Sequence, residues 1–85
     1  MIGEIVAIGT HIKFQDAGPS DSGKTHRWIV RAIADNVALG TIQWWPSWRK
    51  YTYCPIASTV YEHVCLREIA EFFESRTGEQ KRKTK

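Results

Sequence analysis

One aromatic segment, Leu39 to Pro55, constrains the fold of this chain more than any other. It holds three of the four tryptophans and two of the three tyrosines, namely Trp44, Trp45, Trp48, Tyr51 and Tyr53. Two runs typical of β-strands flank a Pro-Ser break in this segment, which predicts a β-hairpin. A domain of this size has a thin interior, because it buries only about 60% of the surface that its unfolded chain exposes. We therefore expect some of these rings to face outward, where aromatic side chains beside cations are typical of a binding surface.

Composition favours one small globular domain with a weak positive charge. The chain has 85 residues, of which 42% are hydrophobic and 12% aromatic, enough for a packed core. Its net charge is +3. Part of that charge comes from the terminal run Lys81 to Lys85, and the rest of the chain is close to neutral. The charge balance alone is therefore a weak indication of a nucleic-acid surface.

The sequence predicts a cytoplasmic protein without cofactor or metal. No stretch approaches the ~20 apolar residues of a membrane span. The N-terminal MIGEIVAIG contains an acidic residue and no basic leader, so we expect no signal peptide. In that compartment Cys54 and Cys65 are expected to be free thiols. The histidines His11, His26 and His63 have no ligand spacing, and we expect no metal site.

The first part of the chain predicts a small sheet. A high content of β-branched residues, or the alternation of apolar and polar residues, predicts four strands. They cover Glu4–Phe14, Arg27–Ala34, Ala38–Trp45 and Arg49–Cys54. Gly9 suggests a bulge or kink in the first strand. The segments 16–24 and Asp35-Asn36 are predicted to be a loop and a turn.

The last part predicts one amphipathic helix. Thr59 and Glu62 have the spacing of a capping box. Beyond them an apolar stripe of Leu66, Ile69 and Phe73 faces the sheet, and Gly78 is the expected helix stop. The fold class is therefore α+β. We predict a meander of three to four antiparallel strands with one C-terminal helix on one face, forming a domain over residues 1–78, and a disordered basic tail over 79–85.

The segment Gly18–Thr25 matches the phosphate-binding pattern G-x-x-x-x-G-K-[ST] in full. If the match were functional, Lys24 would contact phosphate oxygens and Thr25 would hold a magnesium ion. Such a loop needs a buried strand before it and a helix after it, and here the residues that follow alternate like a strand. We expect a hairpin loop, and nucleotide binding stays a remote alternative.

Strand alternation sorts the aromatic residues into two sets. One face of the third strand carries Gly40, Ile42 and Trp44, and the other carries Leu39, Thr41, Gln43 and Trp45. One tryptophan then joins the helix-covered core and its neighbour points away, and Tyr51 and Tyr53 are separated from Lys50 and Thr52 in the same way. Cross-strand ring pairs that stiffen the hairpin would explain some of these residues. The candidate partner-binding set consists of the five rings and the nearby cations: Trp44, Trp45, Trp48, Tyr51, Tyr53, Arg49, Lys50, Arg27 and Arg31.

The second half of the chain resembles a pattern of small uncharacterised bacteriophage and prophage proteins. The residues that carry the likeness are Gly40-Thr41-Ile42, Trp48-Arg49-Lys50-Tyr51, Pro55, and Cys65-Leu66-Arg67-Glu68-Ile69-Ala70-Glu71-Phe72. They correspond to a hairpin with W-R-x-Y on its second strand, followed by a helix that opens with C-L-x-x-I-A-x-F. The resemblance implies a compact sheet-plus-helix fold and a phage origin, and hence the cytoplasm of a host cell. Phage proteins of this size often bind and block host machinery, including defence complexes such as CRISPR effectors.

Two classes of function remain open at this point. We favour a non-catalytic protein that docks its hairpin on a host protein or nucleoprotein complex, with anti-CRISPR-like inhibition as the sharpest version. The alternative is a single-stranded nucleic-acid-binding protein that stacks bases on the rings while the cations meet phosphates. The sequence contains no nucleophile–base pair, so we expect no enzyme. Whether the chain is a monomer or a homodimer is left open.

Overall fold

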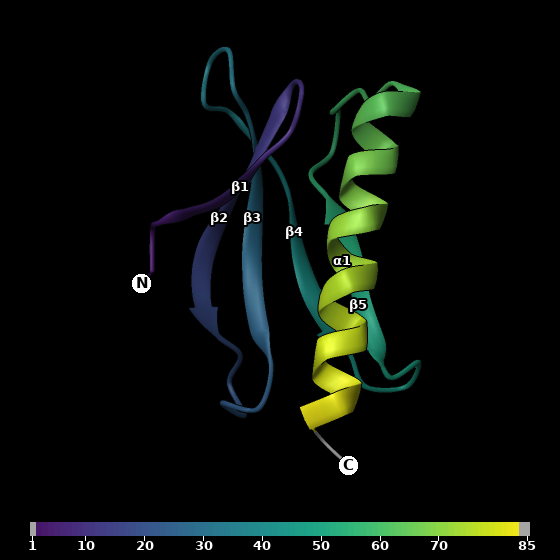
Figure 1. Cartoon of the computed structure of the whole chain (residues 1–85). Helices are drawn as coiled ribbons and strands as arrows, with labels where there is room; N and C mark the ends of the chain where they lie inside the picture. The colour runs from purple at the N-terminus through teal and green to yellow at the C-terminus, as the bar shows by residue number, and fades with distance from the viewer. Residues whose placement is uncertain (1, 84–85) are drawn as a thin grey trace.

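The computed structural model describes residues 2–83 and contains five antiparallel strands and one helix (Figure 1). The elements are β1 (Ile5–Ile8), β2 (Ile12–Pro19), β3 (His26–Ala32), β4 (Ala38–Trp45), β5 (Lys50–Pro55) and α1 (His63–Lys83). The strands pair in sequence order, β1-β2-β3-β4-β5, so the sheet is a meander. The predicted α+β class is confirmed.

The sheet has five strands where three to four were predicted, because the segment Glu4–Phe14 contributes to two strands rather than one. The chain reverses around Gly9 and Thr10, where the amide of Gly9 donates to the carbonyl of Ile12 at 2.7 Å. The carboxylate of Glu68 lies against this turn, 2.6 Å from where a Cβ on Gly9 would stand. Gly9 therefore marks a tight turn that packs against the helix, rather than a bulge within a strand.

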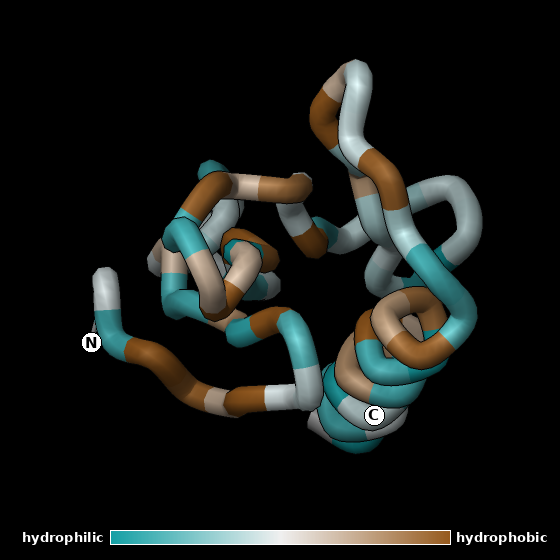
Figure 2. The backbone as a smooth tube through the Cα atoms, turned by 90° about the horizontal axis from the view of Figure 1, so that it is seen from above, coloured by the Kyte–Doolittle hydropathy of each residue, from teal (hydrophilic) through white to brown (hydrophobic). Residues whose placement is uncertain are grey.

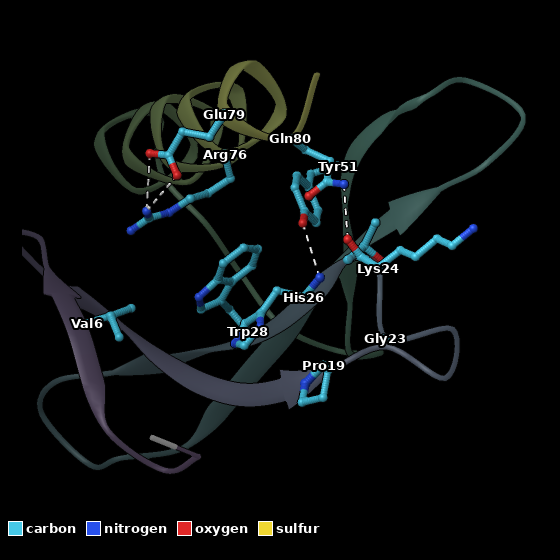
Figure 3. Close-up of a pocket in the computed structure, with 11 residues that line it drawn as sticks. Val6, Pro19, Gly23, Lys24, His26, Trp28, Tyr51, Arg76, Glu79 and Gln80 are labelled. Carbon is cyan, nitrogen blue, oxygen red and sulfur yellow. Dashed lines mark hydrogen bonds and ion pairs between the residues drawn. The ribbon is translucent and has the colours of Figure 1, made fainter. Parts of the chain in front are cut away.

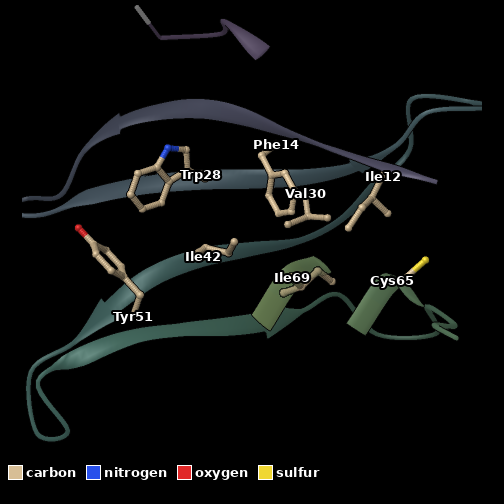
Figure 4. Packing of buried hydrophobic residues seen from close by; sticks show 8 residues of the cluster. All are labelled: Ile12, Phe14, Trp28, Val30, Ile42, Tyr51, Cys65 and Ile69. Atoms are coloured by element: carbon tan, nitrogen blue, oxygen red, sulfur yellow. The ribbon is translucent and has the colours of Figure 1, made fainter. Parts of the chain in front are cut away.

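One face of the sheet forms the core (Figure 4). The buried strand residues alternate along the chain, as a sheet with one dry face requires. The buried cluster comprises Ile12, Phe14, Trp28, Val30, Ile42, Tyr51, Cys65 and Ile69. The rings of Phe14 and Phe72 stack with centroids 4.2 Å apart, which joins β2 to the helix.

The helix α1 lies alongside the strands, nearest β5 (Figure 1), and the view from above shows the helical coil to one side of the rest of the chain (Figure 2). It buries Cys65 and Ile69, and Phe72 and Phe73 are partly buried against the core. The prediction that Leu66 belongs to the buried stripe is wrong, since its side chain is 50% exposed. The buried line of the helix starts one residue earlier, at Cys65, because residues four apart share a face.

Both predicted helix ends are wrong. Thr59 donates to the carbonyl of Ile56 at 2.8 Å instead of capping the helix. The cap is Glu62, whose carboxylate accepts from the amide of Cys65 at 2.7 Å, and this bond lowers the pKa of Glu62.

At the other end, the helix continues through Gly78 to Lys83. Gln80 is buried and donates to the carbonyl of Lys24 at 3.0 Å, which holds the last turns against the loop between β2 and β3. Residues 79–83 are therefore not a disordered tail, and Thr84 and Lys85 lie outside the described residues. No helix within residues 2–83 is long and apolar enough to cross a membrane.

The core makes one stability prediction. Ile42 is fully buried on β4, so we expect Ile42→Ala to lower the free energy of unfolding by about 2–5 kcal/mol through lost burial and a residual cavity. Urea denaturation measures this change. The control is Ile8→Ala, because Ile8 is 73% exposed and its truncation should cost no more than about 0.5 kcal/mol. Equal effects of the two substitutions would contradict this assignment of the core.

Candidate docking surface

The turn between β4 and β5 projects two tryptophan rings into solvent. Trp45 and Lys50 form the last strand pair, and the amide of Arg49 donates to the carbonyl of Trp45 at 2.9 Å to close the turn. Arg49 has a φ of 53°, in the left-handed region that a tight reversal requires. The side chains of Trp45 and Trp48 are 43% and 63% exposed. Their ring centroids are 5.8 Å apart and the ring planes are tilted by 46° to each other, so the two indoles form one exposed aromatic pair.

The other three rings of the hairpin belong to the interior. Trp44 is half-buried and meets Tyr51 edge to face at 5.1 Å. Tyr51 is 3% exposed. Tyr53 is half-buried and shares a hydrogen bond of 2.7 Å with the hydroxyl of Tyr61. The alternation predicted from the sequence is therefore confirmed, and it leaves two of the five rings available at the surface.

The two tyrosines have roles that tie the sheet to its neighbours. The Tyr51 hydroxyl accepts from the amide of His26 at 3.1 Å, and the Tyr51 amide donates to the hydroxyl of Thr77 at 2.9 Å. Tyr53 covers Gly40, where an added Cβ would stand 2.6 Å from the Tyr53 oxygen. Burial raises the pKa of both phenols, so both stay protonated at neutral pH.

The outer face of the sheet, opposite the helix, is cationic. The positions that alternate with the buried residues place Lys13, Arg27, Arg31 and Lys50 on this face, together with Gln15, Gln43, Thr41 and Thr52. No aspartate or glutamate occupies an outward position of the five described strands. The Nε atom of Arg31 donates to Oε1 of Gln15 at 2.7 Å, and the guanidinium of Arg27 donates to the carbonyl of Pro19 at 3.0 Å.

The structure thus separates the sequence-predicted residues into two groups. Trp45, Trp48, Arg49 and Lys50 come together at the exposed turn, and Arg27 and Arg31 lie on the adjoining outer face. We call these six residues the tip surface. Trp44, Tyr51 and Tyr53 lie on the inner face of the sheet and are not part of it.

The segment Gly18–Thr25 ends β2 and forms the loop before β3, as predicted for a hairpin. Several of its backbone amides already donate within the loop. Gly18 donates to Asp16 at 2.7 Å, Ser20 to Thr25 at 2.9 Å, and Gly23 to Ser20 at 2.9 Å. A strand and not a helix follows the loop, so the amide cradle of a nucleotide-binding loop is not formed.

A pair that sequence reasoning missed lies beside this loop. The Nε2 atom of His26 is 2.6 Å from Oδ1 of Asp16, which also accepts from the amide of Gly18. The hydrogen bond from Gly18, followed by that from His26, lowers the pKa of Asp16. The two residues are ten apart in the sequence and no short motif links them, so only strand pairing could have brought them together.

The structure agrees with the expected state of the cysteines. Cys54 and Cys65 are free, and burial raises the pKa of the Cys65 thiol, which disfavours a nucleophilic role. Over residues 2–83, no cluster of three or more potential ligands is placed to hold a metal ion.

Comparison with known proteins identifies no relatives: no family model, curated protein or solved structure matches this chain.

The lowered pKa of Asp16 predicts acid sensitivity of the folded state. The folded form binds the proton of the Asp16 carboxyl less tightly than the unfolded form does. The interactions of Asp16 with Gly18 and His26 therefore stabilise the fold at pH values above 3.8, the ordinary pKa of aspartate. This contribution is lost as the pH falls below that value towards the lowered pKa. We therefore expect the melting temperature of the wild type to fall more than that of Asp16→Asn between about pH 5 and pH 2.

Asp21→Asn is the matched control, because Asp21 is exposed in the same loop. It should follow the wild type at every pH. Parallel melting curves for the wild type and Asp16→Asn would contradict the assigned role of Asp16.

Proposed function

We propose that this protein is a non-catalytic binding protein that docks its tip surface on an acidic surface of a host protein or nucleoprotein complex. The observation that carries the proposal is the pair of exposed indoles on a hydrogen-bonded turn, flanked by Arg49 and Lys50. Tryptophan and arginine are the residues that most often dominate binding energy at protein interfaces. A closed turn also fixes the rings before binding, which limits the entropy lost on association.

Charge determines the kind of surface that fits. The outer face adds cations next to the tip and offers no outward carboxylate on the described strands, so the partner should carry negative charge around a hydrophobic recess. The resemblance to phage proteins makes inhibition of a host defence complex, of the anti-CRISPR kind, the sharpest form of this proposal.

Single-stranded nucleic acid is the second candidate, favoured by the same cations. Base stacking needs ring faces open along the strands, as in sheet proteins that bind RNA. Three of the five rings lie on the inner face, and the remaining two pack against each other at the tip. For this reason we rank the protein partner first.

Affinity capture from host lysate tests the proposal, with the purified partner then measured directly. We expect Trp48→Ala and Trp45→Ala to weaken binding of the purified partner by at least about tenfold, which is the loss of one interface anchor. Both residues are exposed, so the fold should be kept, and thermal melting checks this. Tyr51→Ala is not a suitable test, because Tyr51 is a core residue.

The matched control is Val60→Ala, which truncates a 91% exposed apolar side chain away from the tip surface. This variant should bind like the wild type. If both tryptophan variants also retain full affinity, docking through the tip is rejected. If the captured partner is instead single-stranded DNA or RNA, with affinity that falls steeply as salt is added, the second candidate is correct.

A further inference from the structure

A second candidate site lies on the other side of the sheet from the outer face, between β1, β3, β5 and the C-terminal half of α1 (Figure 3). It is a pocket of about 380 Å³ with a mixed lining. Its walls include the rings of Trp28 and Tyr51, the side chain of Val6, and the charged or polar groups of His26 and Arg76. This volume falls within the range of about 300–1,000 Å³ that is usual for small-molecule sites.

Arg76 is the central polar group of this pocket. Its guanidinium carbon lies 4.7 Å from the centroid of Phe72 and 5.6 Å from that of Trp28, so two aromatic rings hold the group in place. The Nε atom is buried and has no hydrogen-bond partner. Glu79 reaches Nη1 at 3.4 and 3.5 Å, which are long distances for a charge-assisted hydrogen bond.

An unpaired buried donor is costly, and a native structure usually supplies an acceptor for it. In arginine, Nε and one terminal nitrogen form a planar fork that matches the two oxygens of a carboxylate or phosphate. The orphaned Nε of Arg76 is half of such a fork. The carboxylate of Glu79, which also lines the pocket, forms an ion pair with Nη1 only, so the Nε atom still lacks an acceptor.

Tyr51 provides a second donor in the same pocket. Its hydroxyl oxygen accepts from the amide of His26, so its own proton is available for donation. Burial keeps the phenol protonated, since it raises the pKa of Tyr51. The hydrogen bond from His26 and the charge of Arg76 oppose that rise in pKa, and the charge of Glu79 adds to it. Tyr51 and Arg76 both line the pocket.

We propose that this pocket binds a small organic oxyanion, with its carboxylate or phosphate held by Arg76 and Tyr51 and its apolar body against Trp28. The site is separate from the tip surface, since its residues lie on the inner face of the sheet and on α1. Binding here does not depend on the function proposed above.

Nuclear magnetic resonance titration of the full chain tests this site. The probes are phenyl phosphate and benzoate, with inorganic phosphate to measure the anion alone and benzyl alcohol to measure the ring alone. We expect saturable shifts of the Trp28 indole and the His26 and Tyr51 amides with the aromatic anions. Benzyl alcohol should bind at least about tenfold more weakly, because it lacks the charged partner of the guanidinium.

Arg76→Gln should weaken phenyl phosphate binding by at least about tenfold, and Arg82→Gln is its control. Arg82 is an exposed cation on the same helix, so this control removes equal charge without touching the pocket. If Arg76→Gln unfolds the chain, Tyr51→Phe replaces it, because that change removes the hydroxyl and keeps the ring.

The outcomes separate clearly. Equal affinity for phosphate and phenyl phosphate would support a site for the free oxyanion, and tighter binding of phenyl phosphate would support the full proposal. The proposal is overturned if no anion gives saturable shifts, if Arg76→Gln or Tyr51→Phe binds as tightly as the wild type, or if benzyl alcohol binds as tightly as phenyl phosphate.

Discussion

The packing of one helix against one face of the sheet is the constraint on which the rest of this structure depends. It leaves a single dry face, so each strand residue is buried or exposed according to its position in the alternation. Ile42 and Tyr51 fall on the dry face, whereas Trp45 and Lys50 fall on the wet one. The same rule that builds the core therefore selects which aromatic and cationic side chains another molecule can reach.

Much of this arrangement could be predicted from the sequence, because strand alternation is a local property. The meander, the turn at Asp35-Asn36 and the division between Trp44 and Trp45 follow from patterns a few residues long. The additional strand was missed because β-branched residues continue up to the reversal at Gly9, and a glycine alone does not distinguish a kink from a turn. Gly78 failed as a helix stop because a distant contact, between Gln80 and Lys24, holds the helix beyond it.

The two candidate sites also differ in how far the sequence could indicate them. Four of the six tip residues, Trp45, Trp48, Arg49 and Lys50, are close together in the sequence, so composition alone indicated them. Arg76 and Trp28 come from elements far apart in the chain, and neither stands in a recognisable motif. What reveals that pocket is a physical imbalance, a buried donor without an acceptor, and such an imbalance exists only in three dimensions.

Two sets of hydrogen bonds fix the helix beside the pocket that lies between it and the sheet. Near its start, Glu68 accepts from the amide and the hydroxyl of Thr10, and near its end Gln80 donates to the carbonyl of Lys24. These contacts lie in the turn before β2 and in the loop between β2 and β3, so they fix the helix to the sheet at two separate points. A hinge motion of α1 would have to break the hydrogen bonds at one of these two points. Because these contacts hold α1 in place, the cleft is already formed without a ligand, and binding of the proposed oxyanion would require no movement of the helix.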